Sequence, residues 1–199
     1  MMNLFYNPKG VGDVAFLQIN PVEGDIAYEI KENVVQLTQD NAVVGFNIFN
    51  FSHYFHIQDV GNIKLTEEIL NKLQQVISEA GYSYQLDADL SPKFVVGYVK
   101  TKEKHPNADK LSILSVDVAT EVLQIVCGAP NVEAGQKVVV AKVGAVMPSG
   151  MVIKDAQLRG VDSSGMVCSM KELNLPNAPQ EKGILVLSDN YQIGQAFFE

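Results

Sequence analysis

The segment His105-Pro106-Asn107-Ala108-Asp109-Lys110 separates two short apolar runs in the second half of the chain. Similar runs recur towards the end of the sequence, divided by Gly, Pro, Asn and Asp, with no long helical pattern between them. The runs are 94–99, 111–118, 122–126, 138–143, 152–158 and 184–187. Many short strands between turn residues are typical of a small closed barrel or sandwich, so we predict an all-β domain here.

One short helix is also predicted in this half. Ser169-Met170-Lys171-Glu172 has the spacing of a capping box, Leu173 follows it, and Pro176 would end the helix. In such a box the Ser and Glu side chains each accept a hydrogen bond from the backbone N–H of the other residue. We therefore predict a single helical segment that begins at Ser169.

The first half has a different pattern. Residues 13–20 and 33–51 are rich in Val, Ile and Phe, and Gln39-Asp40-Asn41 predicts a hairpin turn between 34–38 and 42–49. Strands separated by such a turn indicate an antiparallel sheet in this half of the chain.

A helix is expected after these strands. Thr66 is its predicted N-cap, apolar residues recur at helical spacing after it, and Gly81 closes the segment. The sequence thus predicts an α+β domain at 1–90. A short polar linker that ends at Pro92 should be extended, and the all-β domain at 93–199 follows it.

Charge is distributed unequally between the halves. The chain of 199 residues has a net charge of −8. Residues 1–92 contain four basic and twelve acidic side chains, whereas residues 93–199 contain eleven of each. All the excess negative charge therefore lies in the first half, and the balanced second half has room for a local basic face. Such asymmetry indicates two domains with different roles.

Residue types that catalyse reactions or bind metals form no recognisable pattern. His53 and His56 would point to opposite faces of a strand. Cys127 and Cys168 lie in apolar surroundings and have no second ligand nearby in the sequence. A Gly-x-Ser-x-Gly elbow, a Walker loop and a dinucleotide fingerprint are all missing. We predict no catalytic residue, no metal and no cofactor, so we expect the protein not to be an enzyme.

The sequence also predicts a cytoplasmic protein with no membrane contact. Two cysteines imply no disulfide framework. No stretch approaches the roughly 20 consecutive apolar residues that a membrane helix needs. Residues 1–9 lack the basic start and apolar core of a signal peptide.

Two polar loops in the second half contain the residues best suited to binding phosphate. Pro106 with its neighbours makes a rigid turn that presents Lys110 at the mouth of the predicted barrel. The segment Arg159-Gly160-Val161-Asp162-Ser163-Ser164-Gly165-Met166 places a guanidinium and two hydroxyls beside two glycines, a combination that suits phosphate. The alternative is that both loops are ordinary turns with structural Asn, Asp and Gly, and these residues alone leave both interpretations open.

Three motifs in one order resemble a known family. They are 105–111, then Gln124-Ile125-Val126-Cys127-Gly128-Ala129-Pro130-Asn131, then 158–169. The family is the tRNA-binding domain near the N-terminus of the bacterial phenylalanyl-tRNA synthetase beta chain. With its extra first domain, the short chain also resembles free-standing tRNA-binding-domain proteins of the YtpR type. The resemblance covers about 93–199 and implies an oligonucleotide-binding (OB) barrel that recognises tRNA by shape.

The resemblance also assigns roles to individual residues. The positions that it implies for RNA binding are Asn107, Lys110, Arg159, Ser164 and Met166. The positions that it implies for holding the loops are His105, Asp109 and Asn131. The chain ends at Glu199 without the catalytic-like and editing modules of the synthetase, so no aminoacylation is expected.

We therefore predict a protein that binds folded tRNA without catalysis. Of sixteen Phe and Tyr residues, five lie in the second half, which disfavours recognition by stacking of bases. Contacts with phosphates and 2′-hydroxyls are expected instead. Further candidates for these contacts are Lys100, Lys102, Lys104 and Lys142.

Two other interpretations remain open at this point. In the first, the OB barrel is a retained protein-interaction or assembly module. The acidic domain 1–90 and the aromatic-rich run 46–55 would then serve a protein partner or a homodimer, although a buried strand pair is the favoured explanation of that run. In the second, the first half is the active domain of a tRNA-processing enzyme, which the missing nucleophile and metal patterns disfavour.

Overall fold

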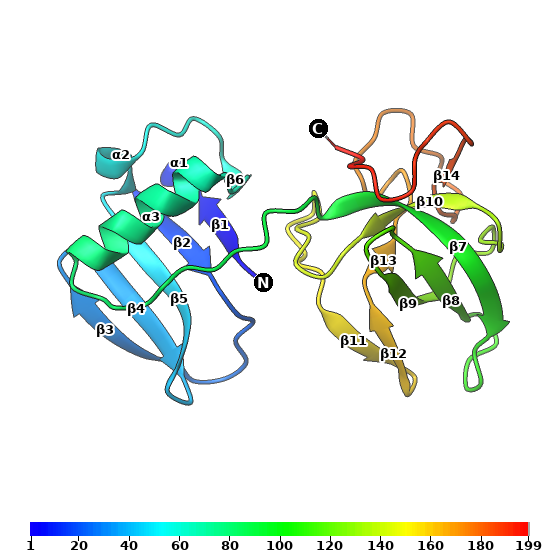
Figure 1. Cartoon of the computed structure of the whole chain (residues 1–199), viewed down its shortest axis with the longest axis horizontal. Helices are drawn as coiled ribbons and strands as arrows, with labels where there is room; N and C mark the ends of the chain where they lie inside the picture. Colours follow the sequence, from blue (N-terminus) through cyan, green and yellow to red (C-terminus); the bar gives the residue numbers. More distant parts are fainter. Residues whose placement is uncertain (199) are drawn as a thin grey trace. The chain divides into compact units, whose positions relative to one another are not determined.

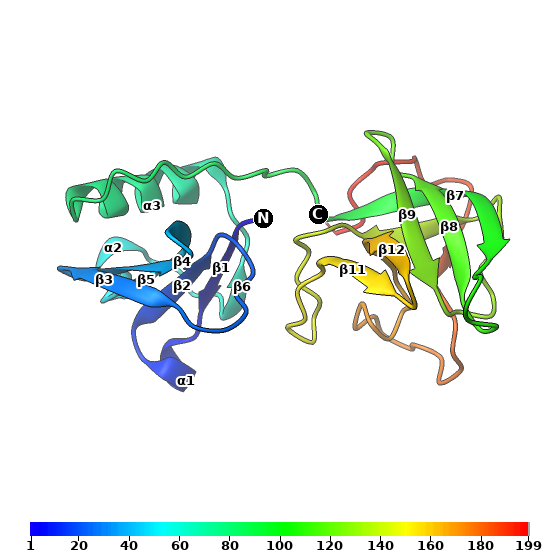
Figure 2. The ribbon, with the colours of Figure 1, turned by 90° about the horizontal axis from the view of Figure 1, so that it is seen from below.

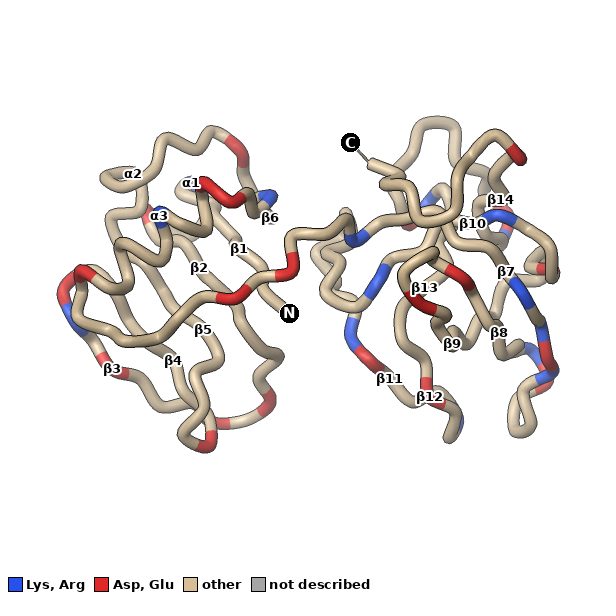
Figure 3. The backbone as a smooth tube through the Cα atoms, viewed as in Figure 1, with Lys and Arg blue, Asp and Glu red and all other residues tan. Residues whose placement is uncertain are grey.

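The computed structural model describes residues 1–198, and strands predominate in it (Figure 1). The chain divides into two compact units, here called unit 1 (Met1–Ser91) and unit 2 (Pro92–Glu199). Acidic residues outnumber basic ones along the backbone of unit 1, whereas both signs are mixed in unit 2 (Figure 3).

Unit 1 is built on one six-stranded antiparallel sheet in the order β3-β4-β5-β2-β1-β6. Its strands are β1 (Asn3–Tyr6), β2 (Val14–Gln18), β3 (Ala27–Lys31), β4 (Val34–Gln39), β5 (Ala42–Phe49) and β6 (Gly61–Ile63). The predicted hairpin is confirmed as β4 and β5. Asp40 and Asn41 at its turn both have positive φ, 50° and 65°, as a two-residue hairpin turn of type I′ requires.

Three helices accompany this sheet: α1 (Pro8–Val11), α2 (Phe51–Tyr54) and α3 (Glu67–Glu79). The helix predicted after Thr66 is confirmed as α3, whose first turn is capped by Thr66 Oγ1, which accepts a hydrogen bond from the backbone N–H of Ile69 at 3.2 Å. Gly81, with φ of +88°, follows its end. Figure 2 shows α3 along one face of the sheet.

The core of unit 1 lies between that face and α3. Leu73 and Ile77 of α3 are fully buried with Phe46 and Ile48 of β5. The aromatic run 46–55 belongs largely to this core, because Phe46, Phe51 and Phe55 are buried within it. The expected burial is therefore confirmed for these three residues, but the expected strand pair is wrong, because the run consists of the end of β5 followed by the short helix α2.

Unit 2 contains a six-stranded antiparallel sheet, in which five strands follow the order β13-β10-β7-β8-β9 and the sixth, β14, pairs with β10. A separate hairpin joins β11 to β12. The strands are β7 (Phe94–Lys104), β8 (Ser112–Asp117), β9 (Val122–Cys127), β10 (Lys137–Ala141), β11 (Asp155–Leu158), β12 (Val161–Ser164), β13 (Met166–Val167) and β14 (Val186–Leu187). The expected strand at 152–158 is therefore shorter than predicted, with Val152 in an isolated bridge to Val146.

The sheet of unit 2 curls because the long strand β7 pairs with different neighbours along its two halves. The first half of β7 pairs with β10, its second half pairs with β8, and the register shifts between Val99 and Thr101. At the edge of the sheet, Ser163 Oγ of β12 accepts a hydrogen bond from the backbone N–H of Val126 in β9 at 3.0 Å. Aliphatic side chains such as Leu114, Val116 and Val140 fill the interior.

Gly97 occupies the crowded middle of β7. A Cβ atom built there would lie 2.6 Å from Val140 Cγ2 and 2.7 Å from Val116 Cγ1, both well inside van der Waals contact. Glycine is thus required where β7 passes over two core valines.

The predicted helix at Ser169 is wrong, although its capping interactions form. The backbone N–H of Glu172 donates to Ser169 Oγ at 3.2 Å, and the backbone N–H of Ser169 donates to Glu172 Oε2 at 2.7 Å. The segment is nevertheless only a turn. Asn174 takes a left-handed φ of 52°, and Pro176 follows, so no second helical turn can form.

We predict that Gly97→Ala destabilises unit 2 by about 1–3 kcal/mol, because the added methyl overpacks the core. Urea denaturation followed by circular dichroism measures this loss. Val140→Ala removes the Cγ2 atom that a Cβ at position 97 would meet. The double variant should therefore lose less stability than the sum of the losses of the two single variants. Equal midpoints for Gly97→Ala and the unmodified chain would contradict the steric explanation.

Candidate functional site

The loop 105–111 is fixed from within by the His105 imidazole. This side chain is 2% exposed, and its Nε2 lies 3.0 Å from the backbone oxygen of Leu158. Its Nδ1 accepts a hydrogen bond from the backbone N–H of Asn107 at 3.0 Å. The two partners together assign the proton to Nε2, which donates to Leu158. One buried ring therefore joins the loop after β7 to the end of β11.

A second bond joins the same two segments. Asn107 Nδ2 donates to the backbone oxygen of Arg159 at 3.2 Å. Arg159 and Gly160 form the two-residue turn between β11 and β12, with positive φ of 52° and 86°. A non-glycine residue at positive φ is uncommon, and here the turn directs the Arg159 backbone carbonyl to Asn107.

This arrangement presents two cations at the surface. Lys110 and Arg159 are exposed, and neither forms an ion pair within residues 1–198. We call Asn107, Lys110 and Arg159, with the two loops that carry them, the loop cluster. Its exposed ammonium and guanidinium groups are positively charged donors, so its chemistry suits a phosphate or another anion.

The structure separates the other two expected RNA-binding residues from this cluster. Ser164 pairs with Asp155 at the base of the β11–β12 hairpin, whereas Arg159 lies at its tip. Ser164 and Met166 are half-buried on either side of Gly165, and Met166 packs against core residues. A Cβ on Gly165 would lie 3.0 Å from the backbone oxygen of Ala141, so the backbone passes close to β10 here.

The residues expected to hold the loops differ in what they contribute. Asn131 bonds Ile184 twice, through Nδ2 to its carbonyl at 3.0 Å and through Oδ1 to its N–H at 2.8 Å. Asp109 forms an ion pair with Lys104 at 3.1 Å, and both side chains are largely exposed, so water screens this pair and its contribution to stability is small. His105 and Asn131 thus hold loops in place, whereas the Asp109 carboxylate contributes this exposed ion pair.

Three of the four additional lysine candidates have acidic partners. Lys102 contacts Glu133 at 2.9 Å, Lys104 contacts Asp109 and Lys142 contacts Glu121 at 3.6 Å. The charges of these three lysines are partly neutralised, whereas those of Lys110 and Arg159 are not neutralised by an ion pair among residues 1–198. Sequence spacing could not identify these pairs, since the residues of the Lys102 and Lys142 pairs come from different strands and loops.

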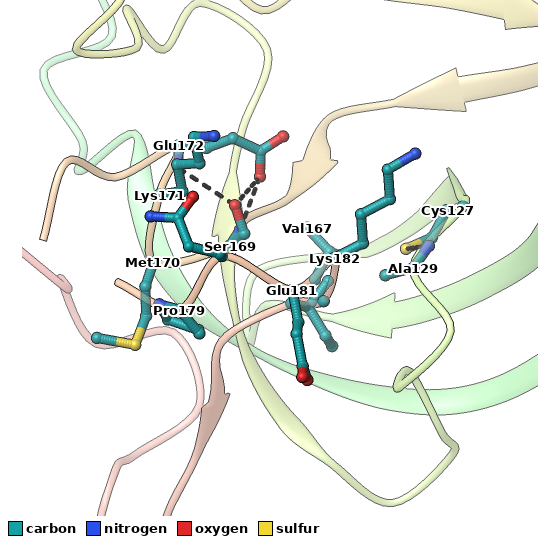
Figure 4. Close-up of a pocket in the computed structure, with 14 residues that line it drawn as sticks. Cys127, Ala129, Val167, Ser169, Met170, Lys171, Glu172, Pro179, Glu181 and Lys182 are labelled. Atoms are coloured by element: carbon teal, nitrogen blue, oxygen red, sulfur yellow. Dashed lines mark hydrogen bonds between the residues drawn. The ribbon is translucent and has the colours of Figure 1, made fainter. Parts of the chain in front are cut away.

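A groove of about 450 Å³ lies beside the loop cluster and was not predicted (Figure 4). Its walls come from 127–129, 169–172 and 179–184. Gly128 connects it to the cluster, because a Cβ there would lie 3.8 Å from the backbone oxygen of Lys110. Figure 4 shows Glu172 turned back onto Ser169, and two exposed lysines, Lys171 and Lys182, also line the groove.

Both cysteines are buried, and burial raises their pKa values. The pKa of Cys127 lies above its usual value, and that of Cys168 rises to about 12. Both side chains are therefore neutral thiols near pH 7, a form that is a poor nucleophile and a poor metal ligand. Within the described part of the chain, no helix is long and apolar enough to cross a membrane.

Comparisons with known proteins identify the family to which the chain belongs. The family described as "Putative tRNA binding domain" matches residues 94–196, and the chain belongs to this family. A domain of unknown function matches residues 21–89.

Individual relatives extend the match. The chain is 56% identical over 199 residues to "Putative tRNA-binding protein YtpR" of Bacillus subtilis, covering 98% of this chain and 99% of that protein. It is 49% identical over 130 residues to the phenylalanine–tRNA ligase beta subunit of Campylobacter jejuni, covering 64% of this chain but 17% of the subunit. A crystal structure of the C-terminal domain of Plasmodium vivax p43 aligns with a TM-score of 0.39 and 26% identity, covering 55% of this chain and 61% of that one.

We predict that His105→Ala destabilises unit 2 by about 1–3 kcal/mol, because the carbonyl of Leu158 and the N–H of Asn107 both lose their partner. Hydrogen exchange should show faster exchange at the Asn107 amide. His56→Ala, at an exposed position of unit 1, is the matched control and should change neither quantity. Unchanged exchange at Asn107 in His105→Ala would mean that the ring does not hold the loop.

We also predict slow thiol chemistry in the folded chain. With a pKa of about 12, Cys168 should react with iodoacetamide at pH 8 far more slowly than it does in the unfolded chain. A shift of about three pKa units lowers the thiolate fraction roughly a thousandfold. Mass spectrometry of alkylated peptides, with and without denaturant, measures both sites. Rapid labelling of Cys168 without denaturant would contradict its burial.

Proposed function

We propose that unit 2 binds folded tRNA through the loop cluster, without catalysing a reaction. The observation that carries the proposal is the joining of two loops by His105 and Asn107, which presents Lys110 and Arg159 together and without acidic partners among residues 1–198. The family match over 94–196 and the name of the Bacillus subtilis relative support tRNA as the ligand.

The proposal includes an OB-type barrel for unit 2. The curled sheet in the order β13-β10-β7-β8-β9 supports it, with the loop after its first strand at one end. In OB folds, the loop between the first two strands and the loop before the last strand hold the nucleic acid. Here those loops are 105–111 and the segment with the β11–β12 hairpin, the two that His105 connects.

Recognition through phosphates and 2′-hydroxyls is the proposed mode. Aromatic side chains of unit 2 are largely engaged with one another: Phe198 contacts Phe94 and Phe197 with ring centroids 5.2 and 5.0 Å apart. Base stacking on free rings is therefore not the main source of affinity in this proposal. Ammonium and guanidinium groups that contact phosphates release counterions, so the affinity should fall as salt rises.

The roles of the two domains and of the individual residues belong to the same proposal. Residues 93–199 are the proposed RNA-binding domain, and the acidic domain at 1–90 is the proposed surface for a protein partner or a homodimer. Asn107, Lys110 and Arg159 are the proposed central contacts, while Ser164 and Met166 shape the nearby backbone. A cytoplasmic location fits two buried free thiols, which a reducing compartment preserves.

We predict that Lys110→Glu combined with Arg159→Glu raises the Kd for tRNA at least tenfold. If each cation contacts one phosphate, the salt dependence of log Kd should also fall by about 2 in slope. Fluorescence anisotropy with labelled tRNA across a salt series, using the full chain, measures both. Lys64→Glu, an exposed lysine of unit 1, is the matched control and should retain binding.

Single-stranded RNA of equal length is the competitor in this experiment. Preference for tRNA supports recognition of folded shape. Unchanged tRNA affinity in the double variant would overturn the loop cluster as the site, and absence of binding by the unmodified chain at low salt would overturn the function itself.

A further inference from the structure

The two edges of the unit 1 sheet are protected to different degrees. One edge is β6, only three residues long, and the other is β3, with five. Sheet edges are usually protected from association by Pro, bulges or charges. β3 pairs with β4 in a regular register, contains no Pro, and pairs with no other strand among the described residues.

β3 also exposes apolar side chains on the sheet face away from α3. Tyr28 is 68% exposed and Ile30 is 62% exposed, the highest values among the large hydrophobic residues described as exposed. Their partners across β4, Leu37 and Val35, are half-buried and continue the same face. An apolar stripe on an unpaired edge strand is unfavourable in water, so this edge is suited to a partner.

On the opposite face, the same strand contains two charges of opposite sign. Glu29 and Lys31 are separated by one residue, and their side chains approach to 3.5 Å. Lys31 is held in place because its Nζ donates to the backbone oxygen of Gly81 at 3.2 Å and lies 4.4 Å from the centroid of the Tyr82 ring. A second copy of this strand in the antiparallel direction can therefore place its own Glu29 opposite Lys31 and its own Lys31 opposite Glu29.

We propose that two copies of this chain associate by antiparallel pairing of their β3 strands. A two-fold axis through Ile30 places Ile30 opposite Ile30 of the second copy. It also places Glu29 opposite Lys31 of the second copy, and Lys31 opposite its Glu29. Unlike charges directly opposite one another across two strands stabilise the pairing. The interface is isologous, so one favourable pair occurs twice.

The charges select this register over its neighbours. A two-fold axis normal to the sheet keeps the two faces aligned, so it pairs only residues that share a face. An axis through Glu29 would bring two carboxylates together, and an axis through Tyr28 would leave Glu29 opposite Ala27. Of the three, only the axis through Ile30 pairs unlike charges, and it also places the exposed Ile30 side chains of the two copies opposite each other.

A second copy is favoured over other occupants of this edge. Nucleic acid is disfavoured, because residues 1–92 have a net charge of −8. A cationic segment of another protein would be attracted by this negative charge, but it would place a cation opposite Lys31. The same strand in the antiparallel direction places unlike charges opposite both Glu29 and Lys31. The proposal does not rest on tRNA binding, which belongs to the other unit.

Sedimentation velocity of the full chain over a concentration series tests the proposal. The chain has a mass of 21.8 kDa, and the unmodified protein should shift to twice that mass as concentration rises. Ile30→Lys places two ammonium groups together on the axis, so it should remain monomeric. Val11→Lys changes an apolar residue of α1 that is 55% exposed, and it should dimerise like the unmodified chain.

A charge exchange provides the sharper test. Glu29→Lys makes both positions cationic and Lys31→Glu makes both anionic, so each variant alone should be monomeric. An equal mixture of the two should form a heterodimer, because every pair is then of unlike sign. Circular dichroism confirms that each variant is folded, since Lys31→Glu also loses the contacts with Gly81 and Tyr82.

Two results would overturn the proposal. A monomeric unmodified chain at every concentration would mean that the β3 edge does not bind a second copy, and a cationic partner would then be the next candidate. Equal dimerisation of Ile30→Lys and Val11→Lys would place the interface elsewhere. Neither result affects the anisotropy measurement of tRNA binding, so the two proposals fail independently.

Discussion

The hydrogen bonds of one buried imidazole determine the geometry of the candidate site. His105 joins the loop after β7 to the carbonyl of Leu158, a residue 53 positions further along the chain. Each loop alone would be a surface turn with many accessible conformations. Fixing both loops to one ring removes that freedom during folding instead of during binding. In the proposed function, Lys110 and Arg159 would then meet a phosphate from backbone positions that are already fixed, which would lower the entropy cost of binding.

The sequence predicted best what local interactions decide. The Thr66 cap of α3 and the Asp40-Asn41 turn depend on neighbours within a few residues, and both formed as expected. The segment at Ser169 shows the limit of this reasoning, because its capping box formed while the helix did not. Capping bonds stabilise a first turn, but Asn174 and Pro176 stop the next one.

Long-range pairing explains what the sequence could not predict in the site. Motif order indicated that Asn107 and Arg159 are both candidate RNA-binding residues. The hydrogen bond between them, however, depends on how the β11–β12 hairpin packs against the loop at 105–111. The same motif grouped Ser164 with Arg159, although three residue pairs of the hairpin lie between Ser164 at its base and Arg159 in its turn. Lys102, Lys104 and Lys142 were further candidates for phosphate contacts from the sequence, and only the fold shows their acidic partners.

The separation of charge between the units resolves an apparent conflict with nucleic-acid binding. A net charge of −8 would repel phosphates if it were spread over the whole surface. Screening limits the reach of exposed charges to about 8 Å at physiological ionic strength. A local pair of cations without ion-pair partners among residues 1–198 can therefore bind phosphate even in an acidic protein. In the proposed function, the acidic residues of unit 1 would disfavour RNA there, which is consistent with the proposed use of the β3 edge by a second copy of the chain.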